Sequence, residues 1–297
     1  MKNKHDIIWL EEVDSTNEEA RRRISDIDNL SVVSAVRQTA GRGQRGNRWQ
    51  SADGENLTFS IVLKFGADQL ESMAASGQFV ISEVAALSVV DFLARHDIEA
   101  KIKWPNDIYV GDKKICGILI ENALKGNCLS HSIVGIGLNV NQTVFDPSLP
   151  NPTSMALCHP EHPLYHPDHS RCNPEYSRCH PERSEGSLPF LLNRFMDIFK
   201  EYCKHYLNIT GGLARLRTLY LAQMWKKDVT ARFIDYTDMP SGHIDGPVVP
   251  TYAGLENNGK EFSGIIRGLS DIGNLLVEDL SDGKVREFGF KEIGYIL

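Results

Sequence analysis

The alternation of hydrophobic and polar positions predicts short β-strands in the first half of the chain, separated by turns. These runs are rich in Val, Ile and Leu and are bounded by Gly, Asn and Asp, which is typical of strands. A hairpin is expected around Gly111-Asp112-Lys113, which separates two such runs. The predicted strands are residues 7–13, 31–36, 57–63, 109–110, 114–121 and 132–140.

Apolar residues at three- and four-residue steps predict a long helix that begins between Gln69 and Ser76 and ends near His96. Two further amphipathic helices are expected at residues 188–206 and 212–225. The stripe of the long helix that should face the core is Val80, Val84, Leu87 and Ala94.

After Val229 the pattern changes to short strands divided by turn signals. This texture predicts a small antiparallel barrel. We therefore expect two domains, at residues 1–227 and 228–297, in an α+β fold with a mixed sheet in the first. The turn signals are Ser241-Gly242, Asn257-Asn258-Gly259, Asp271-Ile272-Gly273-Asn274 and Ser281-Asp282-Gly283.

Residues 158–185 repeat a seven-residue unit with Pro at its third place and, in each copy, an acidic residue at its fourth. Proline at this period forbids a coiled coil, and almost no aliphatic side chains are available to bury. Its many histidines raise metal binding as an alternative, but the repeat, and no tetrahedral pattern, sets their spacing. We expect a low-complexity insertion that is disordered or PPII-like, produced by duplication of a short DNA segment.

The composition is that of an ordinary globular protein: 297 residues, 41% hydrophobic, 24% charged, with a net charge of −7. An acidic chain argues against non-specific nucleic-acid binding. The N-terminal residues show no signal-peptide pattern and no apolar run approaches membrane length, so we expect a cytoplasmic protein without a membrane partner. In that compartment the six cysteines are expected to be free thiols.

The chemistry is concentrated in residues 38–49, where three glycines alternate with three arginines before Trp49. Glycines let successive backbone N–H groups turn toward one point, and guanidinium groups add positive charge there, so the loop suits an anionic ligand. A mobile basic loop and an RNA-binding Gly/Arg segment are the alternatives.

Other polar residues stand where predicted strands end. Residues 14–17, Asp-Ser-Thr-Asn, suit a helix N-cap or a polar ligand. Pro105 stops a strand after Lys103 and presents Asn106 and Asp107 in a turn. Lys114 begins the next strand, where it is either solvated or neutralises an anion. Gly135 and Gly137 remove side chains from one face of a later strand, so that a ligand or another backbone can approach closely.

Together these motifs resemble the biotin protein ligases, in order and in spacing, over nearly the whole chain apart from the repeat. The resemblance implies an SH3-like C-terminal domain and a two-step reaction that uses ATP, biotin and Mg²⁺. Biotin is activated as biotinyl-5′-AMP and then transferred to a lysine of a biotin carboxyl carrier protein, by a monomer or homodimer. The matching residues are 14–17, Gln38, 41–49, 103–107, Lys114 with Gly117, and 135–139, and Thr153-Ser154-Met155 resembles the family's helix start after the last of these strands.

The resemblance also implies residue roles. Lys114, Arg42 and Asp107 would be catalytic, with Asp107 orienting either the incoming lysine or Mg²⁺. No metal site of the protein's own is expected. The biotin-binding residues would be Ser15, Thr16, Asn17, Gln38, Arg42, Gly43, Gln44, Lys114 and Gly117. The ATP-binding residues would be Arg45, Arg48, Trp49, Lys103, Asn106 and Asn139.

The chain departs from the family pattern at Gln44 and Asn47, where many members carry Arg or Lys. Arg45 or Arg48 would then supply the charge near the phosphate, and the adenylate would be retained less tightly. The chain begins at the catalytic region without a helix-turn-helix, so DNA repression is not expected. The alternatives are a lipoate or octanoate ligase, whose fold is related, and a non-catalytic interaction protein.

Overall fold

The computed structural model describes residues 5–66, 70–159, 187–207, 212–237 and 259–296; of Arg45, only the backbone is described. The predicted repeat falls almost entirely at residues 160–186, outside the described part, as do the turn signals at residues 241–242 and 257–258.

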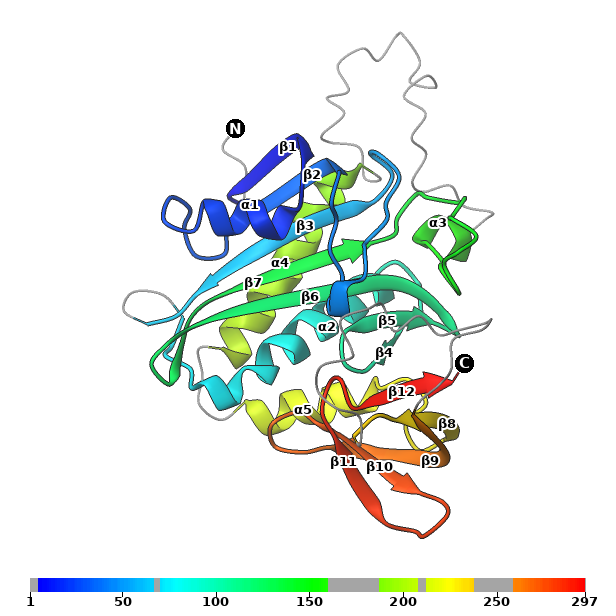
Figure 1. Ribbon diagram of the computed structural model, residues 1–297. Helices are drawn as coiled ribbons and strands as arrows, with labels where there is room; N and C mark the ends of the chain where they lie inside the picture. Colours follow the sequence, from blue (N-terminus) through cyan, green and yellow to red (C-terminus); the bar gives the residue numbers. More distant parts are fainter. Residues whose placement is uncertain (1–4, 67–69, 160–186, 208–211, 238–258, 297) are drawn as a thin grey trace.

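Two β-sheets organise the chain (Figure 1). The larger, seven-stranded sheet has the order β1-β2-β3-β7-β6-β5-β4 and is antiparallel except where β1 and β2 run parallel. This confirms the predicted mixed sheet. Its strands are β1 (Ile7–Val13), β2 (Val32–Gln38), β3 (Leu57–Lys64), β4 (Lys101–Lys103), β5 (Asp107–Val110), β6 (Lys113–Lys125) and β7 (Cys128–Leu138).

Side chains of β3 alternate between the two faces of this sheet, as a strand requires. Phe59 and Ile61 enter the large core, where Phe59 packs against Phe195 of α4 (Leu188–Tyr206) with ring centroids 5.3 Å apart. Val62 points to the opposite face, into a smaller cluster with Ala20 of α1 (Thr16–Arg22). The polar positions of β3 therefore face α1, and this is the face that carries the candidate site.

Helix α2 (Phe79–Ala94) is buried on nearly every side because it packs against both α4 and α5 (Leu213–Ala222) as well as the sheet. Val80, Val84 and Leu87 of the predicted stripe are buried, whereas Ala94 is exposed at the end of the helix. Residues Ala75–Ala94 are apolar and long enough to cross a membrane, but 72% of that stretch is buried inside the molecule, as in the core helix of a globular domain.

The second sheet is antiparallel, with the order β11-β10-β9-β8-β12, and its apolar residues join the same core. It confirms the predicted antiparallel C-terminal unit, whereas the domain boundary at residue 228 stays a prediction. The indole N–H of Trp104 donates to the carbonyl of Gly273 at 3.0 Å and so ties the two sheets together. The strands are β8 (Thr230–Asp235), β9 (Lys260–Leu269), β10 (Leu275–Asp279), β11 (Val285–Phe288) and β12 (Ile293–Ile296).

The remaining elements are short. Helix α3 (Met155–Cys158) starts as predicted, with Ser154 as its N-cap: the Ser154 hydroxyl accepts from the Leu157 N–H. The 3₁₀ helix η1 (Gln44–Gly46) lies within the glycine-rich loop, and the 3₁₀ helix η2 (Ala75–Gly77) precedes α2.

Candidate functional site

The floor of the site consists of strand positions that alternate with core positions. Register places Gly137 opposite both Thr58 and Gly117, and Gly135 opposite both Ser60 and Leu119. Directly paired residues share a face, so these small residues form a shallow floor on the α1 side of the sheet. A cavity of about 840 Å³ lies over this floor.

The glycines of the floor are required because other side chains lie directly on them. A Cβ at Gly137 would be 2.3 Å from the indole of Trp49, and one at Gly135 would be 2.3 Å from Oδ1 of Asn17. The Trp49 ring also lies 3.0 Å from the Cβ position of Gly117. The indole N–H of Trp49 is buried and has no partner among the described residues. The prediction at Gly135 and Gly137 was close approach by a ligand or another backbone; in the structure the side chains of Asn17 and Trp49 occupy that space.

One end of the cavity carries a network of hydroxyl and amide groups. Gln38 Oε1 accepts from the Thr16 N–H at 2.9 Å, and the Ser60 hydroxyl lies 2.8 Å from that of Thr16. The Ser60 hydroxyl is also 2.6 Å from Asn17 Oδ1, while Asn17 Nδ2 donates to Glu121 at 2.8 Å. Ser15, the N-cap of α1, is buried beside them but makes no side-chain cap bond. The Ser15 hydroxyl is therefore available to hydrogen-bond a ligand in the cavity.

The glycine-rich loop folds back on itself around η1. The Gly43 N–H donates to the Asn47 carbonyl at 2.7 Å, the Trp49 N–H donates to the Gly41 carbonyl at 3.0 Å, and Gly46 takes a positive φ of 77°. A left-handed residue at the tip is the position that glycine favours. The loop thereby brings Trp49 back over the floor.

Arg42 is bound by carboxylates at the α1 edge. Its guanidinium pairs with Glu18 and, at 3.0 Å, with Glu121, which also pairs with Arg21 at 2.7 Å. Burial tends to raise the pKa of Glu121, but the hydrogen bond from Asn17 and the two arginines lower it overall. Two negative charges hold the Arg42 guanidinium away from Lys114, although Arg42 lines the same cavity.

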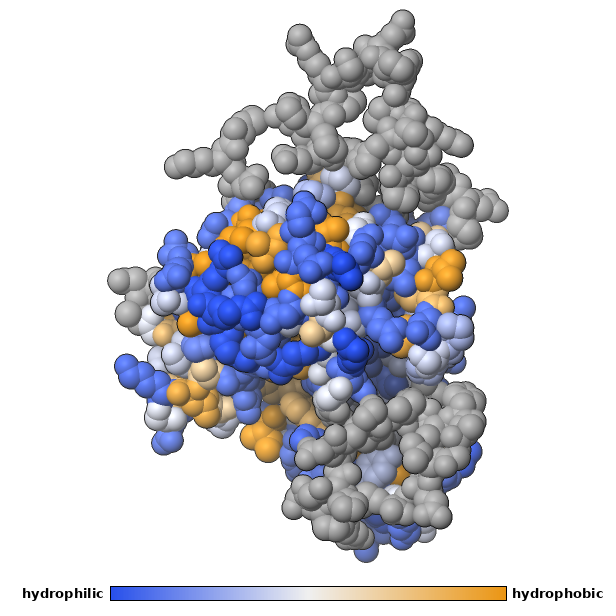
Figure 2. Space-filling model, turned by 45° about the horizontal axis from the view of Figure 1, so that its top comes forward, coloured by the Kyte–Doolittle hydropathy of each residue, from blue (hydrophilic) through white to orange (hydrophobic). Residues whose placement is uncertain are grey.

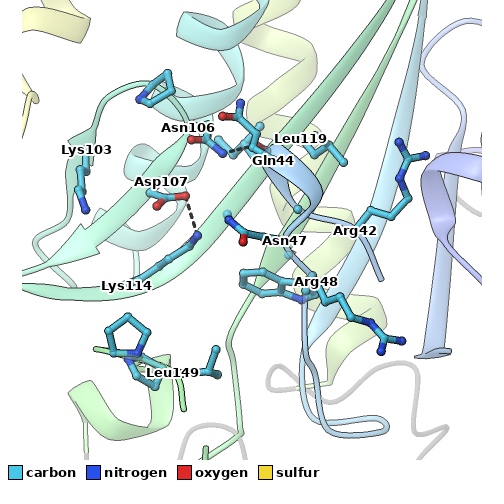
Figure 3. A pocket seen from close by; sticks show the side chains of 18 of the residues that line it. Arg42, Gln44, Asn47, Arg48, Lys103, Asn106, Asp107, Lys114, Leu119 and Leu149 are labelled. Carbon is cyan, nitrogen blue, oxygen red and sulfur yellow. Dashed lines mark hydrogen bonds and ion pairs between the residues drawn. The ribbon is translucent and has the colours of Figure 1, made fainter. Parts of the chain in front are cut away.

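Figure 3 shows the same division of charge. Lys114 and Asp107 point toward one another, whereas the guanidinium groups of Arg42 and Arg48 point away from them. Arg48 instead donates to the Thr39 carbonyl at 3.1 Å. Hydrophilic side chains cover much of the surface on the face turned forward in Figure 2.

Lys114 and Asp107 form an ion pair of 2.7 Å on the cavity wall. Burial acts to lower the pKa of Lys114, but attraction to Asp107 outweighs it and the pKa is raised. Lys114 is therefore a permanent cation at neutral pH. Its Nζ also lies 5.8 Å from the Trp49 ring centroid, so it faces the indole on the floor.

Almost every residue predicted for the site lines this one cavity. Asn106 and Asn139 are also structural, since their Nδ2 groups donate to the carbonyls of Ile118 and Thr153 at 2.9 and 2.8 Å. Arg45 lies in η1 and its side chain is outside the described part. The predicted residues on the wall are Ser15, Thr16, Asn17, Gln38, Arg42, Gly43, Gln44, Arg48, Trp49, Lys103, Asn106, Asp107, Lys114, Gly117 and Asn139.

Sequence reasoning missed two groups of residues. Ser60 and Glu121 support the hydroxyl–amide network, and strand alternation could have found both, because they continue the positions of Thr58 and Leu119. The second sheet contributes part of the cavity wall through Ile293–Ile296, and no sequence signal indicated that contact.

The comparisons with known proteins agree with this geometry. Residues 9–139 match the model of the biotin/lipoate A/B protein ligase family. The similarity to this family therefore lies in the part of the chain that holds the strands of the larger sheet. Over 139 residues it is 31% identical to the bifunctional ligase/repressor BirA of Escherichia coli, a match that covers 47% of this chain and 42% of that protein.

The chain is also similar to the biotin–[acetyl-CoA-carboxylase] ligase of Paracoccus denitrificans. The two are 37% identical over 134 residues, which are 44% of this chain and 53% of that protein. The match thus spans about half the length of these curated relatives or less. The fold resembles the biotin protein ligase from Aquifex aeolicus solved with biotin and ATP, with a TM-score of 0.64, 23% identity and 99% of both chains covered. This likeness extends over both sheets and concerns the fold.

Proposed function

We propose that this protein is an ATP-dependent biotin–protein ligase that forms biotinyl-5′-AMP and transfers the biotinyl group to a lysine of a biotin carboxyl carrier protein. One observation carries the proposal: the Lys114–Asp107 pair and the hydroxyl–amide network of Thr16 and Gln38 line a single cavity. The family match of residues 9–139 supports the reaction class.

The hydroxyl–amide end suits the head group of biotin. A ureido group has one carbonyl acceptor and two N–H donors, and buried hydroxyl and amide groups satisfy both kinds. Ser15, Thr16 and Gln38 supply these groups, and Asn17 is held in place by Ser60. The biotin carboxylate would then extend across the glycine floor toward Lys114.

In the first step a biotin carboxylate oxygen attacks the α-phosphorus of ATP, a P–O bond forms, and pyrophosphate leaves with the electrons of the broken bond. The carboxylate is already ionised, so the step needs alignment and charge neutralisation more than a base. The Lys114 ammonium stays charged beside Asp107 and stabilises the phosphoryl oxygens. Trp49, on the floor, would cover the adenine.

In the second step the acceptor lysine amine attacks the acyl carbon of the mixed anhydride, forming an amide while AMP leaves. The amine must first lose its ammonium proton to solvent water, and Asp107 is the carboxylate on the cavity wall that can then orient the neutral amine. The glycine-rich loop limits access of water to the anhydride.

Mg²⁺ would enter with the ATP phosphates. The described residues contain no group of three or more metal-ligating side chains, so a cage built by the protein does not fit. A single carboxylate such as Asp107 does fit, because Mg²⁺ is commonly held by one or two carboxylates plus substrate phosphates and water. The bound ion would neutralise phosphate charge.

The test is incorporation of biotin into a carrier domain by the purified chain with ATP, followed by mass spectrometry of the acceptor lysine. In parallel, ATP–pyrophosphate exchange is measured with biotin and with lipoate. The proposal expects exchange and transfer with biotin. Exchange with lipoate alone would assign the domain to the other branch of its family, and no exchange with either acid would refute ligase activity.

A further inference from the structure

The C-terminal sheet supplies one wall of the cavity. Ile234 of β8 and Tyr295 of β12 line it together with Asp107 and Lys114. The C-terminal sheet therefore borders the same cavity as the two residues that we propose to be catalytic. It also contacts a lysine on the cavity wall through the ring of Tyr295.

That cation is Lys103. Its Nζ lies 4.7 Å from the ring centroid of Tyr109, 5.1 Å from that of Tyr295 and 5.6 Å from that of Trp225. It also donates to the Tyr109 hydroxyl at 2.9 Å. All three rings lie within the distance at which an ammonium is attracted to an aromatic face. We call these three rings, Tyr109, Trp225 and Tyr295, the Lys103 box.

The box is braced from both sheets. Trp225 donates its indole N–H to the Gly111 carbonyl at 2.9 Å, at the β5–β6 turn, and its ring centroid lies 5.7 Å from that of Tyr295. Tyr295 in turn packs against Phe233 of the C-terminal core at 5.4 Å. The Tyr295 hydroxyl is buried and has no partner among the described residues, so its ring and not its hydroxyl makes the contact.

The two lysines of the cavity are stabilised in different ways. The ammonium of Lys114 lies 2.7 Å from the carboxylate of Asp107. For groups farther away, the negative charge of Asp107 cancels much of the positive charge of Lys114. For Lys103, the described part of the chain provides rings and a phenol but no carboxylate within ion-pair distance. Rings attract an ammonium without neutralising it, so on the cavity wall no paired carboxylate among the described residues cancels the charge of protonated Lys103.

We propose that Tyr295 is a positioning residue for the phosphate end of the site: through the Lys103 box, the C-terminal sheet holds an un-neutralised ammonium against the bound nucleotide. That the ligand is ATP rests on the proposed function. The placement of Lys103 by Tyr295 rests on the distances alone. The C-terminal sheet thereby contributes to nucleotide affinity without touching the reacting atoms.

The protonation state of Lys103 reports on its surroundings in the Lys103 box. Burial lowers the pKa of Lys103 to about 8. Attraction to Asp107 opposes this decrease, and repulsion from Lys114 adds to it. Burial keeps the Tyr109 and Tyr295 phenols neutral by raising their pKa values. On the far side, Lys226 lies 4.2 Å from the Trp225 ring and 3.8 Å from Asp112. The charge of Lys103, and with it ATP affinity, should therefore fall as pH rises through about 8.

The experiment compares Tyr295→Leu with Tyr295→Phe and with Phe262→Leu. Phe262 is an aromatic residue of the same sheet that stacks on Phe233 at 5.5 Å but does not line the cavity, which makes it the control for loosening of the sheet. KM for ATP, KM for biotin and kcat are measured by biotin-dependent ATP–pyrophosphate exchange, between about pH 7 and about pH 9.5, a range that brackets the pKa of a buried lysine.

We expect Tyr295→Leu to raise KM for ATP at neutral pH roughly tenfold, within the range of one buried cation–π contact, with kcat and KM for biotin nearly unchanged. Tyr295→Phe should behave as wild type. The alkaline rise in KM for ATP should move to higher pH in Tyr295→Leu, because water then reaches Lys103. An unchanged KM for ATP in Tyr295→Leu, or an equal increase in Phe262→Leu, would overturn the proposal.

A second measurement separates this inference from the proposed function. Competitive acetylation of lysines across pH, read by mass spectrometry, reports the protonation of Lys103 without any substrate. Half-maximal reactivity is expected at about pH 8 in the wild type and at higher pH in Tyr295→Leu. If the wild type shows no exchange, the ligase proposal fails while this titration still decides the role of Tyr295, and identical titrations in both proteins would contradict it.

Discussion

Lys114 is the residue on which the proposed chemistry depends most. It is a cation at neutral pH because the pull of Asp107 exceeds the cost of burial, and it faces Trp49 across the floor of the cavity. A preorganised charge aimed at a developing anion is commonly the largest single contribution to catalysis. The contribution of Lys114 to catalysis can therefore be measured by substituting this one side chain.

Lys114→Ala should cost at least about 3 kcal/mol of transition-state stabilisation, by analogy with the loss of an oxyanion donor. The measurement is kcat/KM for biotin-dependent pyrophosphate exchange. Lys113→Ala is the matched control, because Lys113 is the exposed neighbour on the same strand. Equal kinetics in the two variants would remove Lys114 from the mechanism.

The sequence was sufficient to predict Lys114, Asp107 and the hydroxyl residues of the site because each stands in a local motif. It could not predict the partners of these side chains. Glu121 binds Asn17 and Arg42, which are 104 and 79 positions away along the chain, and only the packed sheet brings them together. For the same reason the sequence did not show that two carboxylates hold the guanidinium of Arg42, a predicted catalytic residue, at the α1 edge.

At the level of the elements, the central feature is the glycine floor of β6 and β7 under the glycine-rich loop. The strand pattern predicted that Gly135 and Gly137 allow something to approach, but the approaching group, Trp49, comes from a loop whose path no periodicity defines. The floor and the loop therefore have to be considered as one unit.

Gly137→Ala should disturb that unit without unfolding the chain. The new methyl group would meet the Trp49 indole at 2.3 Å, so the ring must move. Overpacking of this kind costs about 1–3 kcal/mol, and we expect kcat/KM for ATP to fall about tenfold while the circular dichroism spectrum is retained.

Gly77→Ala is the control for this substitution. Its Cβ would meet only the flexible Met73 side chain at 3.4 Å. Wild-type kinetics in Gly137→Ala would show that the position of Trp49 does not matter for nucleotide use.

In the whole molecule, α2 links the two sheets. Glu83 of α2 is 1% exposed and pairs with Arg217 of α5. Arg217 also donates, at 2.7 Å, to the carbonyl of Ser270, which directly follows β9 of the C-terminal sheet. Burial raises the pKa of Glu83 despite the opposing attraction of Arg217. This bridge was not predictable, because the helix pattern gave α2 one buried face while the structure buries it nearly all round.

Arg217→Met should therefore lower the free energy of unfolding by about 3 kcal/mol, since removing one partner leaves a buried charge uncompensated. Urea denaturation measures this. Arg215→Met, at an exposed position of the same helix, should change stability by less than about 0.5 kcal/mol. If the two variants were equally stable, the bridge would not hold the sheets together.

The repeat is predicted to be dispensable. Helices α3 and α4, which precede and follow it, bury Met155 and Leu191 completely in the described core. We expect a chain lacking residues 160–186, rejoined by a flexible linker, to keep exchange activity within about twofold, because long surface insertions are tolerated at small entropic cost. Loss of activity in a folded deletion variant would contradict this.

The most direct test of the central claim is mass spectrometry of the small molecules produced by the purified chain from biotin and ATP, without a carrier. A ligase that uses Lys114 to stabilise the adenylating step should give biotinyl-5′-AMP, and Lys114→Ala should give at most a trace. Absence of biotinyl-5′-AMP from folded wild-type protein, or an equal yield from Lys114→Ala, would contradict the account.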